Sequence, residues 1–313
     1  MTDPGIGTAG FVGLGMMGLP LVRHLAESAD RLLVQDTRPE AVAEASDHCR
    51  IEAARSLRAI ATDCGVVFTC LPGPDVLRPV HLDPDGLAAG AHAGQIVIEL
   101  STTTPELSAE IASVYAARAA HYVEAMMIGP PATAEARQLF FIAGGDETVR
   151  PRVEAALSAI GRGTSWVGEV GMASRAKLLH NGLGMIHMTA TAEIMGLCMA
   201  SGIDPDAFIE IIRQSPKSKG IGYSTVFDLY AASIAHGHAT GTGKLYLAAK
   251  DTRLAGSMAR KIDYETPLLD NAAAMFNEAM KLGLGEDEYT LVSKVVEQRF
   301  GSAIFGKPEG GCD

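Results

Sequence analysis

A long stretch with few helix breakers, from Gly171 to Ser201, divides the 313-residue chain into two parts with different sequence patterns. At 1.5 Å per residue, a helix of about 30 residues extends roughly 45 Å, which is long for a helix of a small domain. Alternating strand and helix patterns precede the stretch, and almost only helical patterns follow it. The sequence therefore predicts an α/β domain over 1–171 and an all-α domain over 172–305, joined by a helix at about 172–201. The Gly- and Pro-rich end, 306–313, is expected to be a flexible tail.

A glycine motif follows the first predicted strand. The apolar residues 8–12 lead into Gly13-Leu-Gly-Met-Met-Gly18, and an apolar helical pattern begins directly after it. In this order of strand, turn and helix, G-x-G-x-x-G is typical of dinucleotide binding. The glycines permit the turn, the approach of a pyrophosphate and close helix packing, and the helix N-terminus attracts the phosphates. The motif predicts a Rossmann-type domain with cofactor contacts from Gly13, Leu14, Gly15, Met16, Met17 and Gly18.

An acidic residue ends the second predicted strand. Asp36 closes the apolar run that begins at Leu32 and lies 18 residues after Gly18. A carboxylate here accepts hydrogen bonds from the adenosine ribose and repels a 2′-phosphate, so Asp36 favours NAD. The alternative is that Asp36 only caps the next helix. Arg38 could meet a 2′-phosphate, which keeps NADP open as the cofactor.

Further apolar runs predict buried strands at 66–70, 96–100, 121–124 and 139–143. Helical stretches lie between most of them, which indicates a doubly wound, mainly parallel sheet covered on both faces. Ligands bind beyond the carboxyl ends of strands in such sheets. The predicted cofactor contacts at these ends are Leu71, Pro72 and Thr102. For Thr102, an N-cap role at the helix beginning near Pro105 is an equally good interpretation.

Lys177 and Asn181 are four residues apart on the predicted long helix, so they share one face. Their neighbours in the sequence are apolar: Leu178, Leu179, Leu183, Ile186 and Met188. An isolated lysine most often extends to solvent. The other motifs of the chain decide whether this pair has a function.

The composition limits the classes of partner. The chain has 26 Lys and Arg against 37 Asp and Glu, a net charge of −11, which argues against a nucleic acid or an anionic membrane. No apolar run has the length of a membrane span, and the N-terminal residues lack the pattern of a secretory signal. The five cysteines show no CxxC pair and no metal-site spacing. These features predict a cytoplasmic protein with free thiols, no metal and a small-molecule substrate.

Several motifs occur in a fixed order along the chain. They are Phe11–Gly18, Leu71-Pro72, Ser101-Thr102, Gly144-Gly145-Asp146, Gly168-x-x-Gly171, Lys177 with Asn181, and Lys250-Asp251. With these motifs the chain resembles the β-hydroxyacid dehydrogenase family, which includes 3-hydroxyisobutyrate dehydrogenases and tartronate semialdehyde reductases, over residues 8–305. The resemblance implies a nucleotide-binding domain like that of 6-phosphogluconate dehydrogenase, an all-helical C-terminal domain, and a homodimer or homotetramer. It also implies that Lys177 is the catalytic lysine, with Asn181 beside it, and that Lys250 reaches the cleft near the nicotinamide.

The chain departs from the family pattern after the predicted strand 121–124. The family usually has Asp-x-Pro-Val-Ser-Gly-Gly there, and its Ser-Gly-Gly binds the substrate carboxylate, whereas this chain has Glu124-Ala-Met-Met-Ile-Gly-Pro-Pro131. Ile128 has no hydroxyl and Pro130 has no N–H, so only Gly129 keeps its donor. Met126, Met127 and Ile128 are expected to add adaptable apolar surface. The predicted substrate contacts are Met127, Ile128, Gly129, Pro130, Lys177 and Asn181.

A second departure lies at Gly243, where the family has an aromatic residue seven positions before Lys250. The glycine is expected to open space where a ring would lie. Both departures predict a substrate that is larger or less polar than small hydroxyacids. The alternative is that Lys250 or Lys217 binds the carboxylate and small hydroxyacids remain the substrates.

The sequence thus predicts an NAD(H)-dependent oxidoreductase that interconverts a hydroxyl and a carbonyl by hydride transfer, with Lys177 as the acid/base. An imine reductase is one alternative, because that related group has a less polar segment at the same place. Those enzymes usually replace the lysine, which this chain retains. A catalytically silent dinucleotide-binding protein is the other alternative, and the intact pair of Lys177 and Asn181 argues against it.

Overall fold

The computed structural model of the chain describes residues 6–214, 225–237, 243–301 and 305. The predicted flexible tail at 306–313 and the alternative carboxylate ligand Lys217 lie outside the described residues. The chain divides into two compact units, Met1–Lys177 and Leu178–Asp313.

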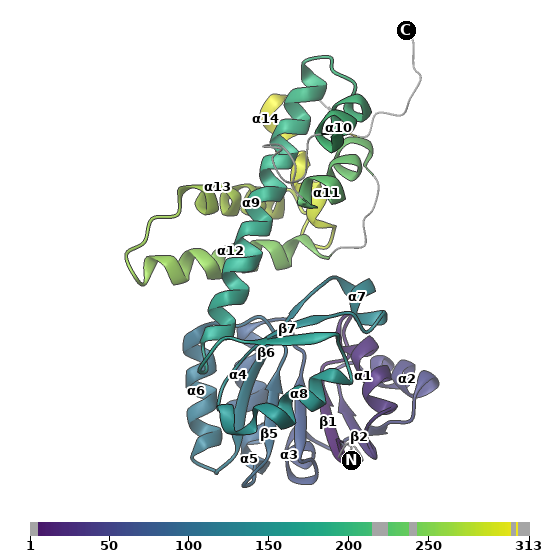
Figure 1. Cartoon of the computed structure of the whole chain (residues 1–313), viewed down its shortest axis with the longest axis vertical. Helices are drawn as coiled ribbons and strands as arrows, with labels where there is room; N and C mark the ends of the chain where they lie inside the picture. Colours follow the sequence, from purple (N-terminus) through teal and green to yellow (C-terminus); the bar gives the residue numbers. More distant parts are fainter. Residues whose placement is uncertain (1–5, 215–224, 238–242, 302–304, 306–313) are drawn as a thin grey trace. The chain divides into compact units, whose positions relative to one another are not determined.

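The first unit is built on an eight-stranded sheet (Figure 1). Its strands are β1 (Thr8–Val12), β2 (Arg31–Gln35), β3 (Glu52–Ala53), β4 (Val66–Thr69), β5 (Ile96–Glu99), β6 (His121–Ile128), β7 (Phe140–Gly144) and β8 (Gly163–Trp166). Their order in the sheet is β3-β2-β1-β4-β5-β6-β7-β8, and every pair is parallel except β6 with β7. The predicted doubly wound, mainly parallel sheet is confirmed, and the order of its first six strands is that of a Rossmann-type fold.

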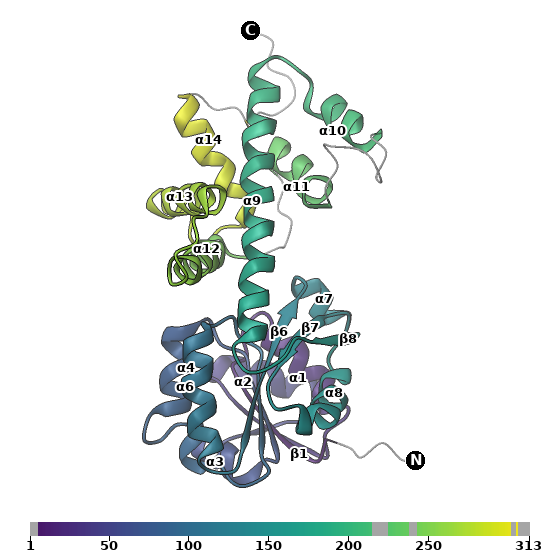
Figure 2. The same cartoon turned by 60° about the vertical axis from the view of Figure 1, so that its left-hand side comes forward.

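Helices cover both faces of this sheet (Figure 2). One face is covered by α1 (Gly18–Ala26), α2 (Pro39–His48) and α8 (Arg150–Ser158), with the 3₁₀ turn η1 (Glu147–Val149) before α8. The other face is covered by α3 (Leu57–Asp63), α4 (Pro74–Leu82), α5 (Leu87–Gly90) and α6 (Pro105–Ala116). A short helix, α7 (Pro131–Glu135), follows β6.

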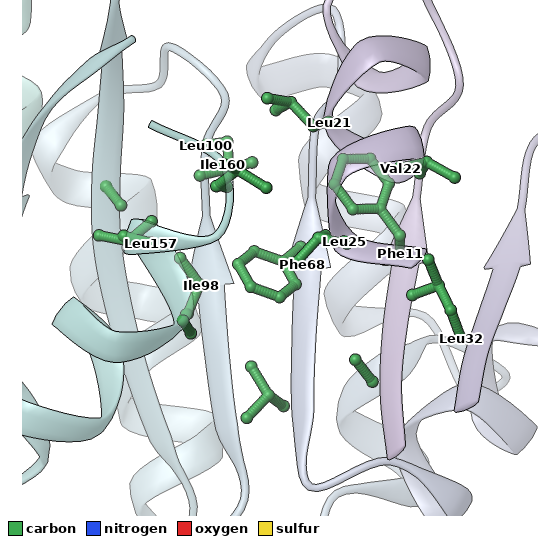
Figure 3. Close-up of a cluster of buried hydrophobic side chains, with 14 of the residues drawn as sticks. Phe11, Leu21, Val22, Leu25, Leu32, Phe68, Ile98, Leu100, Leu157 and Ile160 are labelled. Atoms are coloured by element: carbon green, nitrogen blue, oxygen red, sulfur yellow. The ribbon is translucent and has the colours of Figure 1, made fainter. Parts of the chain in front are cut away.

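The central strands are apolar on both sides because both faces are covered. Phe11 of β1 and Phe68 of β4 are fully buried, and their rings stack at 6.0 Å between centroids. Leu21 and Leu25 of α1 pack in the same cluster, and Ile98 of β5 extends it (Figure 3). Burying one such side chain stabilises the fold by about 1.5–3 kcal/mol. This core fixes the carboxyl ends of β1, β4 and β5, where a ligand of such a sheet would bind.

The second unit is helical, which confirms the predicted all-α part. Its elements are the C-terminal part of α9 (Met172–Ala200), α10 (Pro205–Gln214), α11 (Thr225–His236), α12 (Leu245–Arg260), α13 (Pro267–Lys281), the 3₁₀ turn η2 (Tyr289–Val292) and α14 (Ser293–Phe300). Buried Met188 and Met195 of α9 pack with Phe276 of α13 in the core of this unit. Gly196 allows the close approach of α14, because a Cβ there would lie 2.8 Å from a methyl group of Val296.

Helix α9 alone, among the described residues, is long and apolar enough to cross a membrane. The core helices of globular proteins pass the same test, and 44% of its most apolar window is buried. This one helix is therefore weak evidence and does not indicate a membrane protein.

Candidate active site

The turn between β1 and α1 needs glycine at two positions. Gly13 has φ +98°, and a Cβ there would lie 2.2 Å from the carbonyl oxygen of Cys70. A Cβ on Gly18 would lie 2.0 Å from the carbonyl oxygen of Gly13. A residue with a Cβ would clash with these carbonyl oxygens at either position. The two glycines therefore allow the turn to pack against the end of β4 and the start of α1.

The remaining residues of the motif leave room for an anion. A Cβ on Gly15 would meet nothing within 4 Å, and Gly15 and Met16 are exposed, whereas Leu14 is buried and Met17 half-buried. No side chain caps α1, and its first turn holds no acidic residue. The free N–H groups and the positive end of the helix dipole therefore suit a phosphate. The space beside Gly15 fits the pyrophosphate of a dinucleotide.

Asp36 lies directly after β2 and binds the glycine turn. Its carboxylate accepts hydrogen bonds from the N–H of Leu14 at 2.6 Å and from the N–H of Arg38 at 2.8 Å. The guanidinium of Arg38 contacts the same carboxylate at 3.4 Å and donates to the carbonyl of Leu14 at 3.2 Å. Asp36 therefore supports the turn, in addition to the ribose contact that its position predicts. The side chain of Arg38 is exposed beside this carboxylate.

The loops after β4 and β5 are tied together. The N–H of Leu71 donates to the hydroxyl of Ser101 at 2.7 Å. The hydroxyl that caps α6 belongs to Thr104, which accepts from the N–H of Leu107. The alternative interpretation of Thr102 as this N-cap is therefore wrong. Half-buried Thr102 and exposed Pro72 lie on these two loops, at the carboxyl edge of the sheet.

Lys177 lies in the second turn of α9 and reaches back to β6. Its Nζ donates to the carbonyl oxygen of Met127 at 2.6 Å, and its side chain is half-buried. The neighbouring Leu178 is fully buried, but Leu179 and Leu183 are largely exposed. The apolar surroundings expected for the lysine are thus only partly present.

The predicted substrate segment is part of a strand rather than a loop, because β6 continues to Ile128 and pairs with β7. Met126 is fully buried beside Ala173, so the expectation that it adds surface is wrong. Met127 points to the opposite face of the sheet and packs against the core under α1 and α8. Ile128 lies on the same face as Met126, beside the start of α9, and its side chain is only partly buried.

Gly129 and Pro130 form the tight turn after β6. Gly129 has φ +135°, and a Cβ there would lie 2.9 Å from Thr133. Pro130 and Pro131 have no N–H, and the N–H of Thr133 donates to the carbonyl of Pro130. This exposed segment offers few donors to a carboxylate.

Asn181 belongs to the second unit, where its amide nitrogen donates to a carboxylate oxygen of Asp251 at 2.7 Å. Lys250 of α12 forms an ion pair with the other oxygen of Asp251 at 3.4 Å. Asp251 is 5% exposed, so its charge is buried with these two partners. The structure thus joins Asn181 and Lys250 through a carboxylate to which the sequence interpretation gave no role.

Gly243 does not open space, contrary to expectation. A Cβ at Gly243 would lie 2.9 Å from the hydroxyl oxygen of Tyr289 and 3.0 Å from its ring. The N–H of Tyr289 also donates to the carbonyl of Gly243. Burial and the nearby carboxylate of Asp251 raise the pKa of Tyr289, so its hydroxyl stays protonated. A ring from η2, some 46 residues away in the sequence, occupies the place left by the glycine.

The sequence analysis also gave no role to two buried glutamates, Glu99 and Glu124. Each ends or interrupts an apolar strand, and both are 0% exposed. A charged residue within a buried strand was the available signal, because such residues are rarely buried without partners. Among the residues that the structure describes, no group of His, Cys, Asp and Glu is arranged to hold a metal.

Sequence profiles of known families match both units. The profile of the NAD-binding domain of 6-phosphogluconate dehydrogenase matches residues 8–168. The profile described as the NAD-binding part of NADP-dependent 3-hydroxyisobutyrate dehydrogenase matches residues 171–296. The predicted dinucleotide cofactor is therefore confirmed, with both NAD and NADP represented among the matching profiles.

Individual relatives cover almost the whole chain. The chain is 28% identical to 2-(hydroxymethyl)glutarate dehydrogenase of Eubacterium barkeri, over 95% of this chain and 97% of that protein. It is 30% identical to NAD-dependent L-serine dehydrogenase of Pseudomonas aeruginosa, over 92% and 97%. The solved Mycobacterium tuberculosis 3-hydroxyisobutyrate dehydrogenase with L-serine has a TM-score of 0.79 at 22% identity, over 92% and 98%.

The imine reductases are more distant in fold. An imine reductase of Bacillus cereus has a TM-score of 0.59 at 16% identity, over 93% of this chain and 99% of that chain. The family profiles and the relatives named above are instead those of hydroxyacid dehydrogenases. The chain belongs to the β-hydroxyacid dehydrogenase family.

Proposed function

We propose that this protein is an NAD(H)-linked oxidoreductase that interconverts a hydroxyl and a carbonyl group of a small molecule, with Lys177 as its acid/base. The observation that carries this proposal is the position of Lys177: its Nζ is held at the end of β6 by the carbonyl of Met127. The named relatives, dehydrogenases of L-serine and of 2-(hydroxymethyl)glutarate, support the reaction class.

A dinucleotide held by the glycine turn after β1 would supply or accept the hydride. The chain's own residues handle the proton. During reduction, the protonated Nζ of Lys177 donates to the oxygen of the former carbonyl; during oxidation, the neutral amine takes the hydroxyl proton. The carbonyl of Met127 orients the Nζ of Lys177, and Asp251 fixes the amide of Asn181. These fixed contacts limit the reorganisation that the reaction needs.

For the substrate, we propose a small molecule whose end near Ile128 carries no carboxylate. Tyr289 fills the extra space expected at Gly243, and Met126 is buried. The structure therefore gives no reason to expect a large apolar substituent on the substrate. The shortage of donors at Ile128–Pro131 remains. A charge-assisted hydrogen bond lost at a carboxylate costs about 1.5–3 kcal/mol. The names of the relatives support the alternative, a small hydroxyacid whose carboxylate is held elsewhere, for which Lys250 is the candidate.

A size-matched assay tests both statements. Nicotinamide absorbance is followed with NAD and 3-hydroxyisobutyrate, L-serine, and the amide and methyl ester of each acid, together with cyclic imines and NADH. Turnover of a hydroxyl compound supports the reaction class, and turnover of imines alone contradicts it. If the neutral analogues equal or exceed the acids in kcat/KM, the substrate proposal stands. A preference for the acids of more than tenfold, about 1.4 kcal/mol, overturns it.

Three further proposals complete the function. Residues 1–171 bind the dinucleotide, and residues 172–305 supply substrate and oligomer contacts. The protein is a homodimer or homotetramer, which the exposed apolar residues of α9 support. It works in the cytoplasm, which is supported by the free thiols of the four cysteines in the described part of the chain.

A further inference from the structure

Two buried carboxylates lie side by side in the sheet of the first unit. Glu99 of β5 and Glu124 of β6 are partners in the strand register, and both are 0% exposed. Buried carboxylates are costly unless hydrogen-bonded. Each has its own partners, and these partners belong to different parts of the candidate site.

Glu124 binds the start of α9. One carboxylate oxygen accepts a hydrogen bond from the N–H of Gly171 at 2.7 Å, and the other accepts from the hydroxyl of Ser174. Burial raises the pKa of Glu124, and hydrogen bonds from Ser108, Ser174 and Gly171 counteract this shift. The N–H groups of a first helical turn have no partner within the helix, and an acceptor at this end also interacts favourably with the helix dipole. Glu124 therefore anchors the N-terminus of α9 to β6.

The same strand holds the side chain of Lys177. Met127, three residues after Glu124, accepts the hydrogen bond from the lysine Nζ. Lys177 lies six residues after Gly171, which is about 9 Å along the helix. Strand β6 thus makes three contacts here: at the N–H of Gly171, the residue before α9, at the hydroxyl of Ser174 and at the amine of Lys177. A shift of the helix start relative to β6 would change the direction of the lysine.

We propose that Glu124 is a positioning residue that fixes the acid/base Lys177 by anchoring the start of α9 to the strand whose Met127 carbonyl holds the lysine. This inference rests on the proposed catalytic role of Lys177. Through its bonds to Gly171 and Ser174, Glu124 acts on the lysine by way of the helix. A displacement of about 1 Å in a reacting group can cost roughly 10²-fold in rate.

Glu99 offers a matched control. It has the same burial and lies in the neighbouring strand, but it accepts from the hydroxyl of Thr69 at 2.6 Å, from the N–H of Ser101 at 2.8 Å and from His81 at 3.0 Å. Ser101 in turn binds Leu71. Glu99 therefore supports the loops after β4 and β5, where cofactor contacts are predicted, and none of these three partners belongs to α9.

The experiment compares Glu124→Ala, Glu124→Gln, Ser174→Ala and Glu99→Gln in the full chain. For each variant we would measure kcat, its pH profile and KM. We would also measure the NAD dissociation constant and the amide hydrogen exchange of peptides that cover 168–180. Glu124→Ala is expected to lower kcat by about 10–10²-fold, to leave NAD affinity within about threefold, and to speed exchange in 168–180. Glu124→Gln keeps an acceptor for Gly171, so it is expected to restore most of kcat and the wild-type pH profile. Ser174→Ala keeps the carboxylate and is expected to lower kcat by a few-fold at most.

The controls separate anchoring from other roles. Glu99→Gln is expected to weaken NAD binding and to leave exchange in 168–180 unchanged. Equal acceleration of this exchange by Glu99→Gln would mean that any lost buried carboxylate loosens the unit, and it would overturn the proposal. A Glu124→Gln variant as inactive as Glu124→Ala, with one limb of the pH profile lost, would make Glu124 a proton donor or acceptor and would also overturn it.

The exchange measurement does not depend on activity. If Lys177→Ala were fully active, the proposed function would fail, and the exchange in 168–180 would still decide whether Glu124 anchors α9. If Glu124→Ala does not fold, Ser174→Ala and Glu124→Gln carry the test. Ser174→Ala removes one of the hydrogen bonds to the Glu124 carboxylate, so it should speed exchange in 168–180, and unchanged exchange in this variant would contradict the anchoring role.

Discussion

Lys177 is the residue on which the proposed chemistry depends. Lys177→Ala should lower kcat by about 10²–10⁴-fold, because it removes the group that exchanges the proton, and should leave NAD affinity nearly unchanged. Steady-state kinetics and a binding titration check this expectation. The matched control is Lys281→Ala, an exposed lysine at the end of α13, which should behave as the wild type. Near wild-type kcat in Lys177→Ala would remove the lysine from the mechanism.

We expect Asp36 to set the preference between NAD and NADP. Its carboxylate is 10% exposed and lies beside the glycine turn, so it should favour NAD over NADP, although Arg38 partly neutralises it. The measurement is kcat/KM with each cofactor. Asp36→Asn keeps an acceptor for Leu14 and removes the charge, so it should reduce the preference for NAD, whereas Arg38→Ala should increase it. A tenfold preference of the wild type for NADP would show that Arg38 outweighs Asp36.

The sequence predicted residues whose chemistry is local and missed those defined by distant contacts. Gly13, Gly18 and Lys177 occur in short motifs, and the turn geometry at the glycines has a direct physical cause. The ring of Tyr289 against Gly243 joins parts of the chain far apart in sequence, and a single sequence does not show such pairs. The expectation of open space at Gly243 failed for this reason.

Secondary-structure elements followed the apolar patterns closely. Five of the predicted strands agree with the structure to within a few residues, and the helical pattern expected after residue 201 agrees with the helices of the second unit. The two strands that were missed, β3 and β8, lack the apolar run of a buried strand: β3 has two exposed residues and β8 is Gly-Thr-Ser-Trp. Strand β6 is longer than predicted because β7 pairs with it antiparallel to Ile128. Pairing partners, rather than local propensity, set these boundaries.

Two glycines within α9 give a prediction at the level of the element. A Cβ on Gly184 would meet nothing within 4 Å, whereas one on Gly196 would lie 2.8 Å from Val296. Gly184→Ala should stabilise the chain by about 0.5–1 kcal/mol, because alanine is the better helix former. Gly196→Ala should destabilise it, since overpacking costs about 1–3 kcal/mol. Urea denaturation of both variants measures the difference, and a stabilised Gly196→Ala would show that α14 moves away at little cost.

The whole molecule exposes apolar surface along α9. Leu179, Leu183, Ile194 and Leu197 are 65%, 56%, 44% and 62% exposed. Their spacing of three, four and eleven residues keeps them close to one face of the helix. Contiguous exposed apolar residues are typical of an interface between chains, and covering one such side chain gains about 1.5–3 kcal/mol. The same face explains why α9 is apolar enough to resemble a membrane span.

This surface predicts a homodimer or homotetramer with α9 in its interface. Light scattering at micromolar concentration should report a mass of at least two chains for the wild type. Leu183→Asp places a charge in the middle of the face and should shift the mass toward the monomer, because a buried, unpaired carboxylate is strongly unfavourable. Ile262→Asp is the matched control, because Ile262 is 73% exposed and belongs to the segment after α12 rather than to α9. A monomeric wild type would contradict the assembly, and dissociation by Ile262→Asp alone would place the interface elsewhere.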